Sequence, residues 1–209
     1  MILHSLYIMG ITVEAITGAL KAGTKRMDVF GVTIIACATA IGGGNIRDIL
    51  LGNYPISWVG HPEYIIITTC GALLTILLSP LMKYFHRLFL VLDALGLVTF
   101  TIIGTKTTLA LGHGAVVASI MGVITGVSGG VIRDVLCRDI PLVFQKEVYA
   151  GVSIASAWLY ILLKVRGTHE LTAIITTLAV GFSFRLCAIH FGLEIPKFSY
   201  TAGENRAPQ

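Results

Sequence analysis

Charge is what this sequence has least of. Lys, Arg, Asp and Glu together make up 12% of the 209 residues, about half of the roughly 25% that is usual in soluble domains. Hydrophobic residues make up 55% of the chain, and a soluble domain of this length could not bury so much apolar side chain. The shortage of charge therefore excludes an ordinary soluble protein and indicates a chain that lies in a bilayer.

Residue patterns for metal, redox and catalytic sites are also missing. The four cysteines form no C-x-x-C pair and fall mostly inside apolar runs, which is typical of small packing residues. The sequence does not contain the zinc-protease motif H-E-x-x-H. We therefore expect no enzyme activity, no metal site and no cofactor. The net charge of +4 lies in short clusters between apolar runs, so we expect no binding of nucleic acid.

Long apolar runs are what the chain has in abundance. A helix of about 20 apolar residues spans a bilayer core, and seven runs approach or reach that length. They cover about 2–20, 28–51, 64–82, 87–106, 114–137, 148–164 and 170–191. The connections between them are short. The sequence predicts an all-α integral membrane protein in which residues 1–209 form a single transmembrane domain of seven helices.

An internal repeat divides these helices into two units. The segment 43–50, Gly-Gly-Asn-Ile-Arg-Asp-Ile-Leu, returns at 129–136 as Gly-Gly-Val-Ile-Arg-Asp-Val-Leu, an offset of 86. Pro55 and Pro141 share that offset, whereas Glu14-Ala15 resembles Asp93-Ala94 at an offset of 79. A unit of three helices forces its second copy to cross the membrane in the opposite direction. We predict an inverted repeat, with repeat one about 1–84, repeat two about 85–167, and a seventh helix and tail about 168–209.

The distribution of lysine and arginine predicts the orientation. The N-terminus and the second, fourth and sixth connections share one side, with four basic residues: Arg47, Lys106, Lys164 and Arg166. The other side has ten: Lys21, Lys25, Arg26, Lys83, Arg87, Arg133, Arg138, Lys146, Lys197 and Arg206. The sequence therefore predicts a multi-pass protein of the cell (inner) membrane, with its N-terminus outside and its C-terminus in the cytoplasm.

Two glycine clusters lie just past the middle of the second and fifth helices, at Gly42, Gly43 and Gly44 and at Gly126, Gly129 and Gly130. Glycine in a helix interior costs roughly 1 kcal/mol relative to alanine. We predict that both helices are interrupted near these clusters, so that freed carbonyls can coordinate a cation. The alternative is that the glycines let helices pack closely. The symmetric placement of the clusters, each followed by Arg-Asp, favours the interruption.

Four charged residues follow the glycines by about one turn: Arg47, Asp48, Arg133 and Asp134. Ionisable groups at this depth are expensive. Neighbours in a helix point about 100° apart, so we predict that each side chain reaches another helix or water and does not pair with its neighbour. The functional interpretation is a polar rim along a solute pathway. The alternative is an interfacial side chain or a structural ion pair.

Three more charges lie within the apolar runs. Glu14 and Asp93 are the deepest, and they either line a pathway or hydrogen-bond a broken helix. The sequence leaves both interpretations open. Arg185 lies in the seventh helix near its cytoplasmic end, and we interpret it as a side chain that snorkels to the membrane surface.

The doubled G-G-x-I-R-D segment, the proline that follows it and the seven apolar runs resemble the prokaryotic TRIC family of trimeric intracellular cation channels, over about residues 5–190. The resemblance implies a potassium-permeable homotrimer in which each protomer has its own pore between the two repeats. Carried over by position, it implies an ion pathway along the residues of the doubled segment: Gly42, Gly43, Gly44, Arg47, Asp48, Gly129, Gly130, Arg133 and Asp134. Ser128 stands where the first copy has Gly42.

The function that these observations favour is a monovalent cation channel, with Glu14 and Asp93 added to the ion pathway. Its expected partners are membrane lipids, other copies of the chain and permeant potassium or sodium ions. The cation preference comes from the resemblance, because Arg47 and Arg133 would favour anions if they were exposed. The alternative is a secondary transporter for a small metabolite such as an amino acid, since an inverted repeat also suits alternating access.

Overall fold

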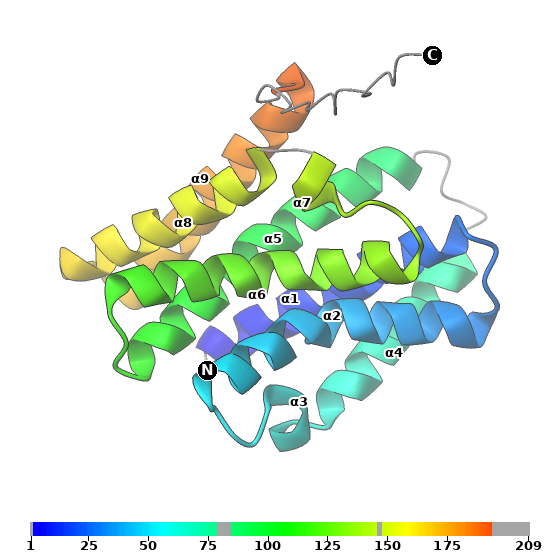
Figure 1. Ribbon diagram of the computed structural model, residues 1–209, viewed down its shortest axis with the longest axis horizontal. Coiled ribbons are helices and arrows are strands. Elements are labelled where there is room, and N and C mark those ends of the chain that lie inside the picture. The colour runs from blue at the N-terminus through cyan, green and yellow to red at the C-terminus, as the bar shows by residue number, and fades with distance from the viewer. Residues whose placement is uncertain (1, 79–84, 146–147, 194–209) are drawn as a thin grey trace, which may run out of the picture.

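The computed structural model describes residues 2–78, 85–145 and 148–193, and all regular secondary structure in these ranges is helical (Figure 1). The helices are α1 (Ile2–Gly23), α2 (Val29–Leu51), α3 (Ser57–Gly60), α4 (Glu63–Leu78), α5 (Phe85–Ala110), α6 (Ala115–Leu136), α7 (Leu142–Gln145), α8 (Val148–Val165) and α9 (Glu170–Phe191). The predicted tail beyond 193 and the basic residues Lys83, Lys146, Lys197 and Arg206 lie outside the described residues.

Six of the described helices are long and apolar enough to cross a membrane: α1, α2, α5, α6, α8 and α9. α4 is a shorter apolar helix of 16 residues and lies where the third apolar run was predicted. The prediction of an all-helical, multi-pass membrane protein is confirmed. The single-turn helices α3 and α7, which follow α2 and α6, were not predicted from the sequence.

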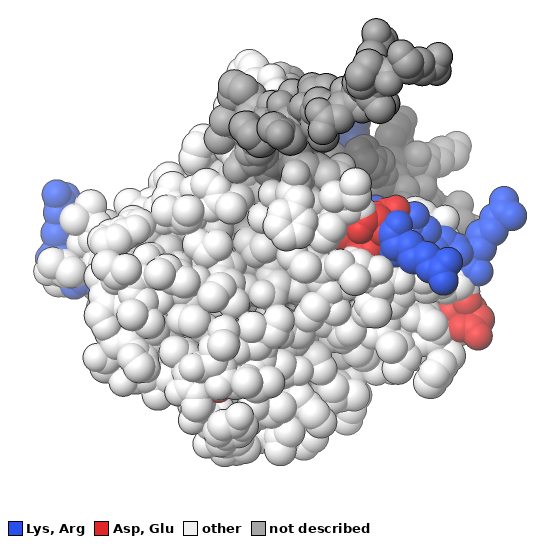
Figure 2. Space-filling model, viewed as in Figure 1, with Lys and Arg blue, Asp and Glu red and all other residues white. Residues whose placement is uncertain are grey.

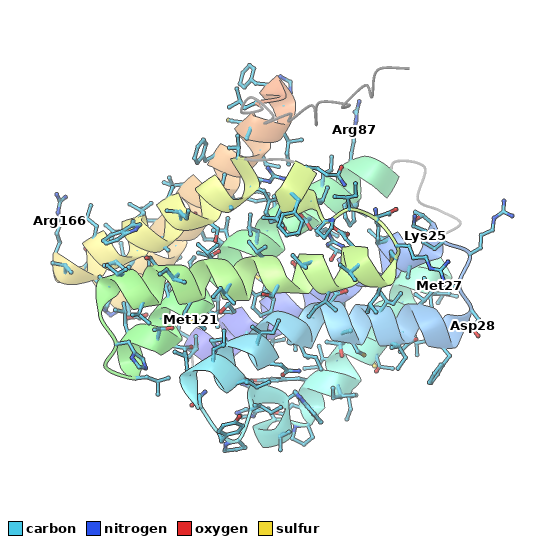
Figure 3. The ribbon with its side chains drawn as sticks, in the orientation of Figure 1. Lys25, Met27, Asp28, Arg87, Met121 and Arg166 are labelled. Atoms are coloured by element: carbon cyan, nitrogen blue, oxygen red, sulfur yellow. The ribbon has the colours of Figure 1, made fainter. Side chains whose placement is uncertain are left out.

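Charged side chains collect at two opposite ends of the molecule (Figure 2). Between these ends the visible face is almost free of charge. Lys25, Asp28 and Arg87 lie at one end of the bundle and Arg166 at the other (Figure 3). An uncharged belt between two charged ends is the arrangement that a bilayer requires, because charge in its hydrocarbon core is costly.

The centre of the bundle is formed by α1, α2, α5 and α6. α2 and α6 lie side by side and run in opposite directions (Figure 1). α1 packs against α5, α4 covers α1 and α2, and α8 and α9 cover α5 and α6. Each repeat therefore contributes its first two long helices to the centre and its third to the outside.

The glycine clusters lie where α2 crosses α6. A methyl group on Gly43 would fall on the carbonyl oxygen of Thr125, and a methyl group on Gly129 would lie 2.5 Å from the carbonyl oxygen of Thr39. Gly129 follows Gly43 by 86 positions, and Thr125 follows Thr39 by 86 positions. The two contacts are therefore equivalent, as across a two-fold axis. Because the two helices are antiparallel, that axis is perpendicular to them and lies in the plane of the membrane. This is the geometry of an inverted repeat.

The same offset holds for the first helix of each unit. A methyl group on Gly18 would meet Thr39 of α2, and one on Gly104 would meet Thr125 of α6. The Glu14 and Asp93 match at an offset of 79 is therefore wrong as a structural equivalence. At an offset of 86, Glu14 corresponds to Phe100 and Asp93 corresponds to Tyr7.

The predicted interruption of the glycine-containing helices is also wrong. α2 continues as α-helix through Gly42–Gly44, and α6 continues through Gly126–Gly130. The cost of each helical glycine, roughly 1 kcal/mol, is offset by the close approach of two backbones that a side chain would keep apart. The close-packing alternative is therefore correct for Gly43 and Gly129.

Substitution of these glycines should destabilise the fold. Gly43→Ala or Gly129→Ala places a methyl group against a carbonyl oxygen, so α2 and α6 must separate, and we expect the unfolding temperature in detergent to fall by several degrees. Gly151→Ala in α8 is the matched control, because no described atom lies within 4 Å of its added methyl group. Equal unfolding temperatures for all three variants would contradict this packing role.

The orientation predicted from lysine and arginine can be tested with reporter fusions. A C-terminal alkaline phosphatase fusion should be inactive, since that enzyme needs an oxidising compartment, and a C-terminal fluorescent protein should be bright. A phosphatase fused after Gly112, between α5 and α6, should be active. The reverse pattern would show that the N-terminus is cytoplasmic.

Candidate functional site

Two cavities enter the bundle from opposite ends. The first, which we call the α3 cavity, has a volume of about 350 Å³ and is lined by Leu3, His4, Tyr7, Arg47, Asn53, Ser57, His61, Tyr64, Ile103 and Thr107. The second, the α7 cavity, has a volume of about 830 Å³ and is lined by Leu20, Lys21, Thr24, Phe89, Leu90, Asp134, Arg138, Asp139, Ile140, Leu142 and Gln145. His4 and Leu20 are separated by about 24 Å along α1 at 1.5 Å per residue.

A narrow central space lies between the two cavities. It is bounded by Glu14, Thr39, Ala40, Gly43, Phe100, Thr125, Gly126 and Gly129, and within these described residues it has no room for a water molecule. Along α1 the α3 cavity, the central space and the α7 cavity follow one another at Tyr7, Glu14 and Leu20. α5 passes the same three spaces in reverse order. Two cavities, with a narrow central space between them that has no room for water, therefore lie in line along α1 and α5.

Arg47 pairs with its neighbour at the inner end of the α3 cavity. Its Nε and Nη2 donate to Asp48 Oδ1 at 2.9 and 2.8 Å, and Nη2 also donates to Ser57 Oγ at 2.8 Å. Asp48 Oδ1 accepts a further bond from Asn53, and Oδ2 accepts two from the backbone and hydroxyl of Ser57. The prediction that Arg47 and Asp48 do not pair is wrong, because the long guanidinium side chain can fold back along its own helix. Both side chains also reach α3, as predicted.

Arg133 is the centre of the equivalent cluster near the α7 cavity and is completely buried. Its Nε donates to Asp134 at 2.9 Å, so here too neighbours pair. Its Nη1 donates to Asp93 at 2.8 Å and to Thr17 at 3.3 Å, and lies 4.0 Å from Glu14. These contacts join α1, α5 and α6 at a single guanidinium.

Acidic groups outnumber basic ones around Arg133. Three carboxylates lie within 4.0 Å of this guanidinium, those of Glu14, Asp93 and Asp134. Glu14 faces the central space and accepts a hydrogen bond from Thr17 of its own helix at 2.9 Å. Because α2 and α6 are unbroken, Glu14 and Asp93 do not serve to hydrogen-bond a broken helix. Glu14 lines the central space, whereas Asp93 is bonded to Arg133 and lines none of the cavities described above.

Arg185 does not snorkel. It is 3% exposed, and its guanidinium stacks on the ring of Tyr149 at 4.5 Å. On the opposite side of the cluster, the guanidinium of Arg133 stacks on Phe89 at 4.6 Å. Tyr149 lies beside Arg133, since both are 3.4 Å from the position of a Gly130 methyl group. The sequence analysis did not identify Tyr149. The one hint in the sequence is that Tyr64 precedes it by 85 positions, one less than the repeat offset. Tyr7, Thr17 and Ser57 were not identified either.

The α7 cavity carries a small charge network between the last turn of α1 and the residues that follow α6. Lys21 and Lys25 each lie 2.7 Å from Asp139. Their hydrogen bonds to the carboxylate lower the pKa of Asp139 below its ordinary value. Asp139 therefore stays ionised and neutralises part of the basic charge at this end.

Comparison with known proteins places the chain in a family. A family model described as "Glycine transporter" matches residues 4–80 and 90–165. A solved structure described as the TRIC trimeric intracellular cation channel orthologue from Rhodobacter sphaeroides is 32% identical with a TM-score of 0.88, over 92% of this chain and 99% of that one. The chain belongs to the prokaryotic TRIC family. A second TRIC structure, from work on conductance through TRIC cation channels, is 30% identical with a TM-score of 0.86, over 97% of this chain and 100% of that one.

Other members of the TRIC family to which the chain is similar are named as membrane proteins. The inner membrane protein YadS of Escherichia coli K12 is 39% identical over 206 residues, which cover 95% of this chain and 97% of the relative. A Vibrio cholerae membrane protein is 39% identical over 202 residues, which cover 96% of this chain and 84% of the relative. Like them, this chain is a membrane protein, and its several long apolar helices make it multi-pass.

Arg133 and Asp93 should behave as a coupled buried pair. Arg133→Gln leaves three carboxylates without their guanidinium and Asp93→Asn removes one counter-charge, so we expect each variant to lose about 3 kcal/mol or more of stability. The double variant should lose clearly less than the sum of the single losses. Unfolding of all three in detergent measures the coupling. Lys25→Gln with Asp139→Asn is the exposed control pair, for which about 0–1 kcal/mol is expected. Additive losses at the buried pair would contradict the contact.

Proposed function

We propose that this chain forms a channel for monovalent cations, potassium among them, with one pathway in each protomer between the two repeats. The similarity to solved cation channels supports the class of function. The observation that carries the proposal is the acidic cluster of Glu14, Asp93 and Asp134 beside a pathway that begins as a cavity at each end. The conduction needs no cofactor and no catalytic group.

The charge balance of the cluster around Arg133 favours cations. Arg47 is 2% exposed and its charge is offset by Asp48. Arg133 is surrounded by three carboxylates. When all of these groups are ionised, the cluster has a net charge of −2. The positive charge of Arg185 reduces this net charge to −1. Fixed acidic groups at a constriction lower the energy of a cation and raise that of an anion. The two arginines of the repeat therefore do not make the pathway anion-selective.

The central space has to widen before an ion can pass. Glu14 and Phe100, at equivalent positions of the two repeats, both line this space together with Gly43 and Gly129. The two glycines lie in continuous helices whose backbones touch, so those helices cannot close further. We propose that movement of the Glu14 and Phe100 side chains opens the pathway, with Gly42, Gly44 and Gly130 forming its wall.

The assembly and the orientation are part of the same proposal. We propose a homotrimer in the inner membrane, with the N-terminus outside and the C-terminus in the cytoplasm. The solved relative from Rhodobacter sphaeroides is described as trimeric. Many large apolar side chains on the outer faces of the helices are exposed, among them Phe30, Leu77, Ile120 and Ile175. Lipid and neighbouring copies of the chain would cover them.

A carrier for glycine or another small amino acid is the second candidate. The description of the matching family model favours it, and so does a pathway closed at the centre with a cavity on each side, the arrangement that alternating access uses. Recordings in planar bilayers separate the two functions. A channel gives unitary current steps in potassium chloride, whereas a carrier gives no steps and saturable uptake of labelled glycine into liposomes.

Glu14→Gln should weaken the cation preference. A unit charge about 8 Å away in a medium of effective dielectric constant about 20 is worth about 2 kcal/mol, so the potassium-to-chloride permeability ratio should fall at least about fivefold. The reversal potential under a potassium chloride gradient measures this ratio. Asp28→Asn is the control, because it removes an exposed acidic charge while asparagine still caps α2. An unchanged ratio in Glu14→Gln would remove Glu14 from the pathway.

A further inference from the structure

We propose that the α3 cavity is a binding site for a small carboxylate, held by Arg47 of α2 and Tyr7 of α1. The site is independent of whether the pathway conducts cations. Its chemistry follows from which donors and acceptors in the cavity are already paired.

One donor group of Arg47 is not used by the hydrogen bonds to Asp48 and Ser57. Its Nε and Nη2 are bonded to Asp48 and Ser57, whereas Nη1 is buried and finds no hydrogen-bond partner among the described residues. An unpaired buried donor is costly, and more so when the group is charged. Arg47 lines the cavity, so a ligand acceptor placed there would remove this cost.

Tyr7 provides a second donor at the same wall. Its hydroxyl is buried near Ser57 and makes no hydrogen bond of ordinary geometry with the described residues. A methyl group on Gly44 would lie 2.7 Å from this hydroxyl and 3.9 Å from Arg47 Nη2, so the two side chains are neighbours. The ring is fixed by stacking on Tyr64 at 4.7 Å and by an edge contact with Phe100 at 5.8 Å. Two donors that line one cavity suit the two oxygens of one carboxylate.

In the second repeat, a carboxylate of the protein itself accepts the hydrogen bond from the equivalent arginine. At the repeat offset of 86, Arg47 corresponds to Arg133 and Tyr7 corresponds to Asp93. Arg133 Nη1 donates to the carboxylate of Asp93 at 2.8 Å. In the first repeat Tyr7 replaces that aspartate, and Arg47 Nη1 is left without an acceptor. A ligand carboxylate in the α3 cavity would restore the contact that the second repeat makes internally.

The α3 cavity suits an anion better than a cation. None of the described residues that line it carries a carboxylate. Two carboxylates lie next to lining residues. Asp48 accepts five hydrogen bonds from Arg47, Asn53 and Ser57, so its oxygens are saturated. Glu63 is exposed and pairs with His61 at 2.9 Å. Leu3 and Ile103 add apolar wall for the remainder of a small aliphatic acid. The cavity volume of about 350 Å³ limits the ligand to a small solute.

Thermal unfolding of the purified full-length protein in detergent tests the site. Sodium acetate supplies the carboxylate alone, and glycine supplies it with an amine. Methylammonium chloride supplies the amine alone, while sodium chloride and sodium phosphate at matched ionic strength test other anions. We expect acetate to raise the unfolding temperature in a saturable manner, because a ligand of the native state stabilises it. Glycine raises it further only if the ammonium group also finds partners. Methylammonium and chloride should have no effect.

Two variants assign the site to its residues. Tyr7→Phe removes only the hydroxyl and should weaken acetate binding roughly tenfold, the change expected from the loss of one charge-assisted hydrogen bond. Tyr54→Phe at the same end of the molecule is the control, because Tyr54 is exposed and does not line the cavity. Arg47→Lys, provided that it folds, should abolish the acetate effect, since the lysine ammonium cannot reproduce the fork of the guanidinium.

Three outcomes would overturn the proposal. One is the absence of a saturable acetate effect on the wild-type protein. Another is an equal acetate effect on the wild type and on Tyr7→Phe. The third is a stabilisation by chloride or phosphate as large as that by acetate, which would show a general anion effect. The assay uses no ion flux, so its result is separate from the test of the cation channel.

Discussion

A buried arginine in each repeat requires neutralisation close by, and much of the central structure follows from this requirement. Arg47 and Arg133 lie near the ends of α2 and α6, where an unpaired charge would be costly. Each is paired with the aspartate that follows it in sequence. That aspartate then accepts a backbone N–H from the start of the next short helix, Ser57 of α3 in one case and Leu142 of α7 in the other. The ion pair thus fixes the chain that forms the wall of each cavity.

The two repeats neutralise their buried arginine with different groups, so the two ends of the molecule differ in charge. Arg133 of the second repeat is surrounded by Asp93 of the same repeat and Glu14 of the first repeat, so this cluster carries an acidic excess. In the first repeat Tyr7 stands where Asp93 would be, and the carboxylate of Asp48 is saturated by the donors around it. In the proposed pathway the cluster around Arg133 therefore favours cations, whereas the α3 cavity presents the unpaired donors of Arg47 and Tyr7. A strictly symmetric molecule could not provide both.

Helix packing sets the closed centre of the pathway. The reciprocal contact of Gly43 with Thr125 and of Gly129 with Thr39 brings the backbones of α2 and α6 together. With no side chain at the glycines, the space beside them is filled by Glu14 from α1 and Phe100 from α5. The rigid part of the centre is thus backbone, while its movable part is two side chains that can change rotamer without unfolding a helix.

The sequence by itself determined the membrane class, the places of the long helices and the two-fold repeat. Apolar runs are local properties of the chain, and three helices in each unit reverse the direction of its copy whatever their packing is. Tertiary structure alone decided that the glycine helices stay continuous, that Arg47 pairs with Asp48, that Arg185 is buried against Tyr149, and that Asp93 corresponds to Tyr7. Each of these depends on which atoms a neighbouring helix brings within contact distance. Helical periodicity places a side chain on a face, but only the approach of another helix decides its partner.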